Sequence, residues 1–413
     1  MLDSSTSEAK LSPSFSRLSW SNLAAQFSEQ ISLAAAPLVA VFVLGAGPGA
    51  AGLLQTVQAL PFLLLSIPAG LLADRVSRKQ LMVHAEALRA VALSCVLLAL
   101  LSSRLSFPML ALLGFLVATC TAVYNVAAPA MVQGIVHRSH LAAANRWLEL
   151  SRSVAFAAGP AIGGALVSWT GAPAAYVLAA ALSIGAALLL AGLPEMPGSG
   201  HVRKNLLREL EEGARFVWDH PLLRPLLLTS IFFNVAWFLL QAIYVLHAVQ
   251  SLKMSAAEVG LSLSALGLGM TAGAVGAKFA AKRLTFGRQL VIGPLCAFVA
   301  AILVFSTLWM PWKALAYAAF FLFGVGPMLW TIATTTLRQA VTPHAMLGRV
   351  SAMIMTATFG ARPLGAAIGA GMGELWGIAA CLAAVLAGFA IQLVILLGSS
   401  APRLRALPSL AAM

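Results

Sequence analysis

The sequence predicts an all-α membrane protein with twelve transmembrane helices, and three observations lead to this fold class. First, 60% of the 413 residues are hydrophobic and only 9% are charged, whereas a soluble domain carries roughly 25% charged residues. Second, the apolar residues form long runs rather than the short alternating segments of a membrane barrel. Third, the basic residues gather between alternate runs, as the positive-inside rule describes.

Each apolar run is long enough to cross a bilayer, because a membrane helix needs about 20 apolar residues. The twelve runs lie near residues 21–44, 52–73, 80–101, 108–131, 148–168, 174–193, 225–247, 257–280, 289–309, 314–336, 350–373 and 377–397.

The basic residues predict the orientation of these helices. If the N-terminus is cytoplasmic, the outer loops hold only Arg104, Lys253 and Lys313 of the 26 Lys and Arg residues, and Arg362 lies within a helix. We therefore expect both termini in the cytoplasm and an even number of helices. Despite the net charge of +13, nucleic acid is not an expected partner, because the basic residues do not cluster with aromatic residues on one face.

The chain divides into two similar halves. We expect an N-terminal six-helix bundle over residues 1–193, a cytoplasmic central loop over 194–221 and a C-terminal six-helix bundle over 222–413. A shift of 206 residues superposes the helices in order and matches Gly159 with Gly365. The two repeats are therefore parallel, and a binding site is expected between them near the membrane midplane. Apolar residues at helical spacing in the central loop indicate either an amphipathic helix or a flexible linker.

The segment between the second and third runs contains Gly70, Asp74, Arg75, Arg78 and Lys79 in a regular pattern. It resembles the G-x-L-x-D-R-x-G-R-K signature of the major facilitator superfamily, with a serine in place of the second glycine. The resemblance implies the fold of that superfamily and a latch at the cytoplasmic side. The aspartate would face the positive N-terminus of the eleventh helix, and the basic residues would pair with acidic groups across the interface.

The fifth run carries Gly159, Pro160, Gly163 and Gly164. They are similar to the G-P-x-x-G-G motif that is more typical of the exporters of that superfamily. Small residues let two helices approach closely, and a proline bends its helix. Generic helix packing is the alternative interpretation.

A closer resemblance covers nearly the whole chain. Residues 27–32, 141–145, 213–224 and 347–350 are similar to the transmembrane secretion effector branch, which is enterobactin-exporter-like and includes drug exporters. The resemblance implies proton-driven efflux across a bacterial inner membrane, with a monomer as the default state. Residues 108–134 contain no Arg, so the coupling scheme of antiporters with an arginine in helix 4 does not transfer to this chain.

Two ionisable residues lie within apolar runs, where a charge at the helix centre costs about 2.5–3.5 kcal/mol. Glu29 lies about eight residues into the first run, and a carboxyl group that changes charge there is a candidate for proton coupling. A structural carboxylate bonded to neighbouring Ser or Gln is the alternative. Arg362 is permanently charged, so it is a candidate for binding an anionic substrate or a carboxylate of the other half. A fixed ion pair is the alternative.

Two further charged pairs stand at helix starts. Glu86 and Arg89 follow His84 in the third helix, and Glu149 and Arg152 begin the fifth. A spacing of three residues places the two members of each pair on one helix face. We interpret both pairs as structural.

Aromatic and amide residues in the fourth, seventh and tenth helices are the pocket candidates, because aromatic walls with a few amides suit a large amphipathic ligand. Helix packing is the alternative. The candidates are Tyr124, Asn125, Asn234, Trp237, Gln241 and Trp330.

No nucleotide-binding loop, zinc-protease motif or serine-hydrolase motif occurs, so we expect no enzyme activity, no cofactor and no metal. The first hypothesis is an exporter of a siderophore-like or drug-like small molecule, driven by protons across the lipid bilayer. An importer or a lysophospholipid-type flippase of the same fold is a second hypothesis. A non-transporting membrane scaffold or regulator is a third, against which the two intramembrane charges argue.

Overall fold

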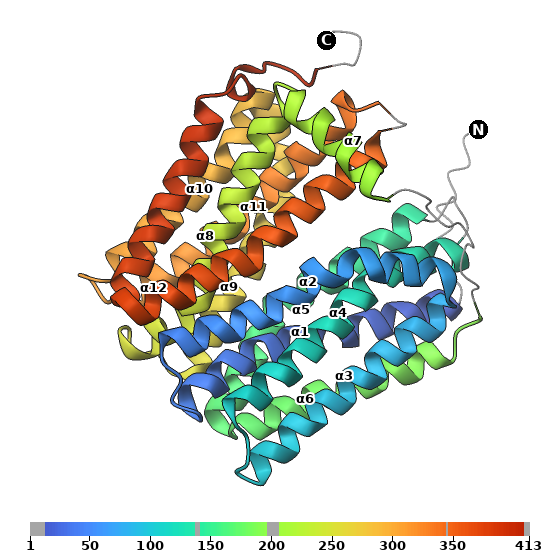
Figure 1. The fold of residues 1–413 in the computed structure, drawn as a ribbon, viewed down its shortest axis with the longest axis vertical. Helices are drawn as coiled ribbons and strands as arrows, with labels where there is room; N and C mark the ends of the chain where they lie inside the picture. The colour runs from blue at the N-terminus through green and yellow to red at the C-terminus, as the bar shows by residue number, and fades with distance from the viewer. Residues whose placement is uncertain (1–12, 137–140, 196–205, 344–345, 409–413) are drawn as a thin grey trace, which may run out of the picture.

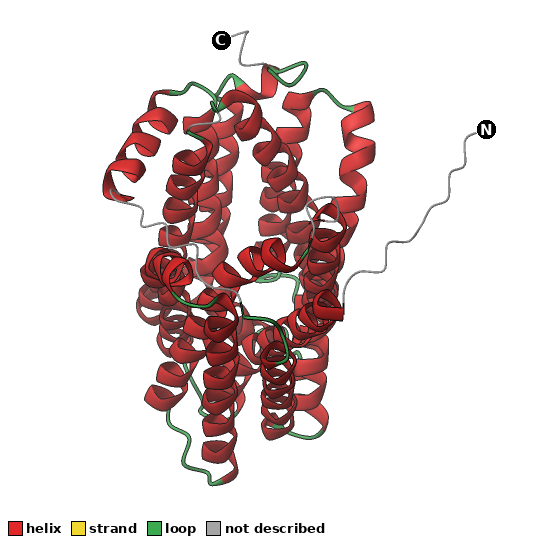
Figure 2. Ribbon diagram, turned by 90° about the vertical axis from the view of Figure 1, so that its right-hand side faces the viewer, coloured by secondary structure: helices red, strands yellow, loops and turns green. Residues whose placement is uncertain are grey.

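The computed structural model describes residues 13–136, 141–195, 206–343 and 346–408, and every regular element within these ranges is a helix (Figure 2). The helices of the first half are α1 Pro13–Phe42, α2 Pro48–Arg75, α3 Arg78–Leu101, α4 Phe107–Ile135, α5 Leu141–Trp169 and α6 Ala172–Ala191. They are followed by α7 Leu206–Asp219, α8 Leu223–Gln250, α9 Ala256–Arg283, α10 Phe286–Ser306, α11 Lys313–Val341, α12 Leu347–Leu397 and the short 3-10 helix η2 Ala401–Arg403.

The predicted all-α membrane fold is confirmed. Among the described residues, ten helices are long and apolar enough to cross a membrane. One of them, α12, contains 51 residues and bends at Gly377, where φ is 76°. Glycine adopts this left-handed conformation without steric cost, and the bend separates the two last predicted spans. α1 is not among the ten, because Gln26, Ser28, Glu29 and Gln30 interrupt its apolar run.

The central segment contains a helix, as one of the two sequence interpretations expected. α7 is strongly amphipathic, with Val217 fully buried and Arg208 exposed. Arg208 forms an ion pair with Glu212 at 3.2 Å, and Glu212 also pairs with Arg349 at the start of α12. The helix is therefore attached to the second half of the molecule. Residues 196–205 of the predicted loop lie outside the described residues.

The helices form two bundles, each with hydrophobic clusters of its own, and a further cluster joins Leu38 of α1 to the core of the second half. One hydrophobic cluster joins α1, α2, α3, α4 and α6, and another joins α7, α8, α10, α11 and α12. The main contacts between the bundles run from α5 to α9 and from α2 to α12. Figure 1 shows that the bundles diverge toward the end where both chain termini lie. The halves thus meet at one end of the molecule and part at the other.

Small residues allow the close contacts at the end where the halves meet. Gly52 of α2 lies against Ala370 of α12, and Gly164 of α5 lies against Gly260 of α9. A Cβ atom at either position would collide with backbone of the opposite half. This arrangement is typical of membrane helices that pack through small side chains.

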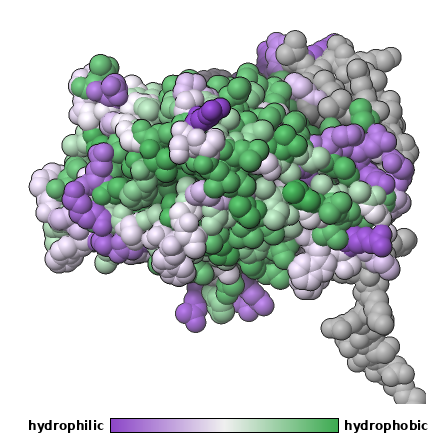
Figure 3. Space-filling model, turned by 90° about the horizontal axis from the view of Figure 1, so that it is seen from below, coloured by the Kyte–Doolittle hydropathy of each residue, from purple (hydrophilic) through white to green (hydrophobic). Residues whose placement is uncertain are grey.

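The outer surface is suited to lipid. Large apolar side chains such as Leu98, Leu112, Leu188 and Val394 are each at least 64% exposed. Figure 3 shows a broad hydrophobic area across the middle of one face, with hydrophilic residues gathered toward two opposite edges. Such a surface is too apolar for water and matches the hydrocarbon core of a bilayer.

Candidate functional site

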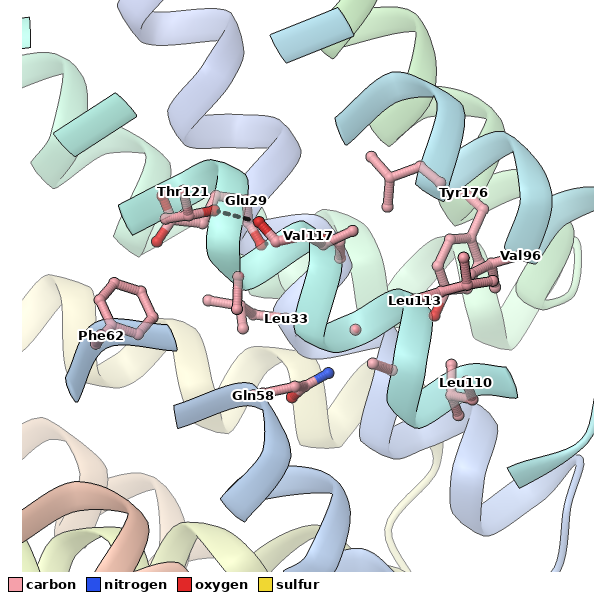
Figure 4. A pocket seen from close by; sticks show the side chains of 15 residues that line it. Glu29, Leu33, Gln58, Phe62, Val96, Leu110, Leu113, Val117, Thr121 and Tyr176 are labelled. Carbon is pink, nitrogen blue, oxygen red and sulfur yellow. Dashed lines mark hydrogen bonds between the residues drawn. The ribbon is translucent and has the colours of Figure 1, made fainter. Parts of the chain in front are cut away.

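Glu29 lies in a pocket inside the first bundle. It is roughly 24 Å along α1 from Pro13, at about 1.5 Å per residue, so it stands near the middle of the helix. The pocket is mostly apolar, and its polar lining consists of Glu29, Ser32, Gln58, Thr121 and Tyr176. Figure 4 shows how side chains from α1, α2 and α4 surround it. The structure therefore places a carboxyl group near the middle of α1, beside a cavity.

A buried ion pair stands next to this pocket. Arg89 and Glu86 of α3 lie 2.9 Å apart, and both side chains are at most 1% exposed. Arg89 also donates hydrogen bonds to the Ala25 carbonyl of α1 and the Thr121 hydroxyl of α4, at 3.2 and 2.9 Å. Because Thr121 lines the pocket of Glu29, the arginine connects the ion pair to the candidate proton site. The predicted proximity of Glu86 and Arg89 is confirmed.

Arg362 lies in α12 of the second bundle. It is midway between Leu347 and the bend at Gly377. Its guanidinium carbon lies 4.4 Å from the centroid of the Phe359 ring and 5.4 Å from that of Phe238. Its Nε donates to Oδ1 of Asn234 at 3.4 Å. Within the described parts of the chain, no carboxylate lies within ion-pair distance of Arg362, so the fixed ion pair considered above is not formed with them.

An aromatic pair connects the two sites across the halves. Phe62 of α2 lines the pocket of Glu29, and its ring centroid is 6.3 Å from that of Phe359 in an edge-on contact. Phe359 is also the ring beneath Arg362. The candidate proton site and the candidate anion site are therefore separated by one pair of phenyl rings.

The structure describes only part of the signature segment between α2 and α3. The surroundings of Gly70 and the side chains of Asp74 and Arg75 are outside what the structure describes, so the latch role of these residues stays a prediction. Lys79 lies 3.7 Å from Glu195, which follows α6 in the same half. This arrangement places the ion pair of Lys79 within one bundle. Arg78 begins α3.

Ser77, which replaces the usual glycine, begins α3 as its N-cap. Its hydroxyl accepts a hydrogen bond from the Gln80 backbone N–H at 3.4 Å and donates one to Glu195 at 2.8 Å. Serine is a preferred N-cap because its side chain satisfies a free backbone donor of the first turn. The substitution therefore supplies a helix cap at this position.

The glycines of the α5 motif allow α5 to pack closely against both α1 and α9. Gly159 and Gly163 lie against Gln30 and Ile31 of α1, whereas Gly164 faces α9. Pro160 has no backbone N–H, and the next backbone N–H, of Ala161, donates to the Ser264 hydroxyl of α9 at 2.9 Å. The motif thus lies at a contact between the two halves.

None of the six pocket candidates lines the pocket of Glu29. Asn234 alone contacts a candidate charge, and its amide nitrogen donates to the Ser230 carbonyl at 2.9 Å, which directs its oxygen toward Arg362. The remaining candidates differ in burial and in their neighbours. Tyr124 is buried in the first bundle, Asn125 is exposed, Trp237 belongs to an aromatic cluster with Phe323, Gln241 is half-buried, and Trp330 packs against Gly293.

Several residues of this region escaped the sequence analysis. Gln58 and Thr121 look like isolated polar residues in apolar runs, and only packing shows that they line the pocket of Glu29. The expected pair of Glu149 and Arg152 does not form an ion pair in the described chain. Arg152 instead lies over the Phe156 ring, at 5.7 Å from its centroid. Among the described residues, no group of three His, Cys, Asp or Glu side chains could hold a metal ion.

Comparisons with known proteins agree with this architecture. The sequence model of the Major Facilitator Superfamily matches residues 18–366. The chain is 31% identical over 268 residues to the uncharacterized MFS-type transporter y4rN of Sinorhizobium fredii, and the match covers 61% of this chain and 64%, just under two thirds, of that protein. It is 28% identical over 308 residues to the enterobactin exporter EntS of Escherichia coli, covering 74% and 72% of the two chains. The crystal structure of a bacterial homologue of the iron transporter ferroportin in the inward-facing state has a similar fold, with a TM-score of 0.72, 15% identity and coverage of 93% and 98%.

Proposed function

The chain belongs to the Major Facilitator Superfamily, and from this premise we propose that it exports a small amphipathic molecule across the bacterial inner membrane in exchange for protons. The molecule would be siderophore-like or drug-like, and Glu29 would bind the proton. The observation that supports the proposal is the pocket of Glu29, a carboxyl group near the middle of α1 and beside the contact of Phe62 with the other half. The similarity to an enterobactin exporter supports the outward direction.

Alternating access suits the arrangement of the bundles. Each half has hydrophobic clusters of its own, and the close glycine contacts between the halves lie toward one end, so each bundle can move as a unit. With the termini in the cytoplasm, as the positive-inside rule predicts, the diverging end would face the cytoplasm and admit the molecule to be exported. Movement of the halves would then close this end and open the other.

Proton binding at Glu29 would change the balance between these two states. An ionised Glu29 is attracted by the charge of Arg89, whereas a protonated Glu29 is not. A ligand or proton shifts a conformational equilibrium only if it interacts differently with the two states. Glu29 meets this requirement if its surroundings change when the two halves move, because Phe62 in the wall of its pocket contacts the other half.

The proposal is tested with inside-out vesicles that carry an imposed pH gradient. A panel of siderophores and amphipathic drugs is added, and dissipation of the gradient is followed with a pH-sensitive dye. We expect at least one compound to dissipate the gradient with the wild type. Glu29→Gln should abolish this effect, because the amide cannot exchange a proton. Glu149→Gln is the matched control, since Glu149 is exposed and forms no ion pair with a described residue. Dissipation by Glu29→Gln at the wild-type rate would refute the role of Glu29.

A further inference from the structure

A second cavity, of about 350 Å³, lies in the second bundle, at the end of the molecule where the chain termini lie. Its walls are the last turns of α9, the first turns of α10, the second half of α11 and the segment that follows η2. α9 and α11 pack closely at Gly273, which lies against Val325, and the cavity begins one turn later, at Ala277. This α9–α11 crevice therefore lies where two packed helices part, and its volume is typical of small-molecule sites, which occupy about 300–1,000 Å³.

The wall of the crevice is mainly apolar. Alanine and larger aliphatic side chains form most of it, among them Ala280, Leu284, Ile292, Leu329 and Ile332. Ile332 is 38% exposed and Leu407, which also lines the crevice, is 43% exposed. A ligand can therefore reach the wall from outside, and an exposed apolar surface of this kind suits a hydrocarbon chain.

The segment after η2 is held against the crevice by the start of α10. Thr285, the N-cap of α10, makes no side-chain hydrogen bond to the first turn, so the backbone donors of that turn need other acceptors. The N–H groups of Phe286 and Gly287 donate to the carbonyls of Arg405 and Leu404, at 3.4 and 2.7 Å. These bonds fix the backbone of Arg405, and its side chain lines the crevice.

Positive charge surrounds the crevice without a balancing carboxylate. Arg405 is exposed and forms no ion pair with any residue that the structure describes. Residues 277–292, 329–336 and 401–408, which supply the walls, contain no Asp or Glu. The same segments carry five further exposed basic residues, namely Lys278, Lys282, Arg283, Arg288 and Arg403. The apolar crevice thus has a basic rim, which favours a ligand with a negative head.

We propose that the α9–α11 crevice binds an anionic phospholipid from the leaflet at this end of the molecule. The positive-inside rule predicts that this is the cytoplasmic leaflet. The lipid phosphate accepts hydrogen bonds from the Arg405 guanidinium, whose planar donors suit phosphate oxygens. One acyl chain lies along the apolar wall. Basic pockets between membrane helices attract anionic lipid headgroups, whereas a soluble anion would leave the apolar wall without a partner.

Native mass spectrometry of the purified full-length protein in a neutral detergent tests the proposal. The protein is titrated with dioleoyl phosphatidylglycerol or dioleoyl phosphatidylcholine, which share their acyl chains and differ in net charge. We expect the first phosphatidylglycerol to bind about fivefold or more tightly than the first phosphatidylcholine, the effect of one basic residue at a membrane surface. Equal affinity for the two lipids would overturn the proposal.

A charge variant locates the binding of the headgroup. Arg405→Gln should reduce the affinity for phosphatidylglycerol to that for phosphatidylcholine, and it keeps the backbone carbonyl that accepts from Phe286. Arg403→Gln is the matched control, because Arg403 is an exposed arginine of the same segment and does not line the crevice. It should keep the preference of the wild type. An equal loss in both variants would indicate a diffuse basic surface and contradict a site at Arg405.

A second pair of variants locates the acyl chain. Ala280→Phe places a ring in the crevice and should weaken the binding of the first phosphatidylglycerol. Ala274→Phe adds the same ring at an exposed position of α9 that does not line the crevice, and it should bind like the wild type. Unchanged lipid binding in Ala280→Phe would show that the crevice does not hold the chain.

Two further measurements complete the test. Glycerol 3-phosphate carries the same phosphate without acyl chains, and at equal concentration it should not displace phosphatidylglycerol. Displacement would assign Arg405 to soluble phosphates and overturn the lipid proposal. Phosphatidylglycerol should also raise the thermal midpoint of the wild type more than that of Arg405→Gln, because a ligand of the folded state stabilises it. Neither measurement requires transport, so the outcome is independent of the proposed exchange with protons.

Discussion

At the scale of single residues, the first half of the molecule holds buried charges through partners from three helices. Arg89 of α3 contacts Glu86, the Ala25 carbonyl of α1 and the Thr121 hydroxyl of α4. Removing one partner of a buried pair leaves an uncompensated charge, which is costlier than losing the pair itself. Arg89 therefore stabilises the bundle and at the same time sets the electrostatic surroundings of Glu29.

We predict that Arg89→Ala destabilises the protein by about 3–5 kcal/mol, because Glu86 then keeps a buried charge without a partner. The double variant Glu86→Gln with Arg89→Ala should lose less than Arg89→Ala alone. Denaturant unfolding in detergent micelles measures both. Arg104→Ala serves as the exposed control. A double variant less stable than the single one would contradict this account.

His220 offers a pH-dependent contact outside the membrane. Its Nδ1 accepts hydrogen bonds from the backbone N–H groups of Leu222 and Leu223 at 3.1 and 3.3 Å, at the start of α8. Partial burial lowers the pKa of His220 below its usual value of about 6.5. The unfolded chain therefore takes up a proton more readily than the folded one, and stability is lost as the pH falls below about 6.5 toward the folded-state pKa.

We predict that the thermal midpoint of the wild type falls more between roughly pH 8 and pH 5 than that of His220→Asn, whose amide oxygen can still accept backbone hydrogen bonds. Thermal unfolding followed at several pH values measures the difference. His84→Asn is the control histidine variant. The same pH profile for the wild type and His220→Asn would refute the prediction.

At the scale of elements, α5 packs both against a helix of its own half and against a helix of the other half. One side of it packs on α1 through Gly159 and Gly163, and another side packs on α9 through Gly164. The first contact holds the bundle together, and the second joins the two halves. A change in Gly164 should therefore affect the relative position of the halves rather than the fold of either.

We predict that Gly164→Ala separates the halves at their closed end, because the added Cβ would collide with the Ala256 carbonyl and the backbone of Gly260. Spin labels at Thr170 and Ser251, placed in a cysteine-free background, report the distance between the ends of α5 and α8. The variant should show a longer or broader distance distribution than the wild type.

The control for this experiment is Gly185→Ala in α6, where no atom lies within 4 Å of the added Cβ. It should reproduce the wild-type distances. Unchanged distances in Gly164→Ala would mean that the α5 and α9 contact does not hold the closed end together.

At the scale of the whole molecule, two helix bundles meet toward one end, and Glu29 and Arg362 lie on either side of the Phe62–Phe359 contact between them. Composition and hydropathy predicted the membrane helices well. A long apolar run that crosses a bilayer must satisfy its own backbone hydrogen bonds, and an α-helix does so within the run. The bend at Gly377 was not predicted, since both flanking runs look helical and only the backbone conformation shows one continuous element with a kink. The amphipathic pattern around Val217 indicated α7, although the sequence left a flexible linker as an alternative.

The sequence by itself determined the fold class, the repeat of the two halves and the positions of Glu29 and Arg362, because length, periodicity and the cost of intramembrane charge are local properties of the chain. Only the tertiary structure decided which residues surround those charges. It brought Thr121 and Gln58 to Glu29, and it left Arg152 without Glu149 and over the Phe156 ring. The physical reason is that side chains of opposite halves meet only through packing between helices far apart in the chain. No sequence pattern records which faces of those helices meet.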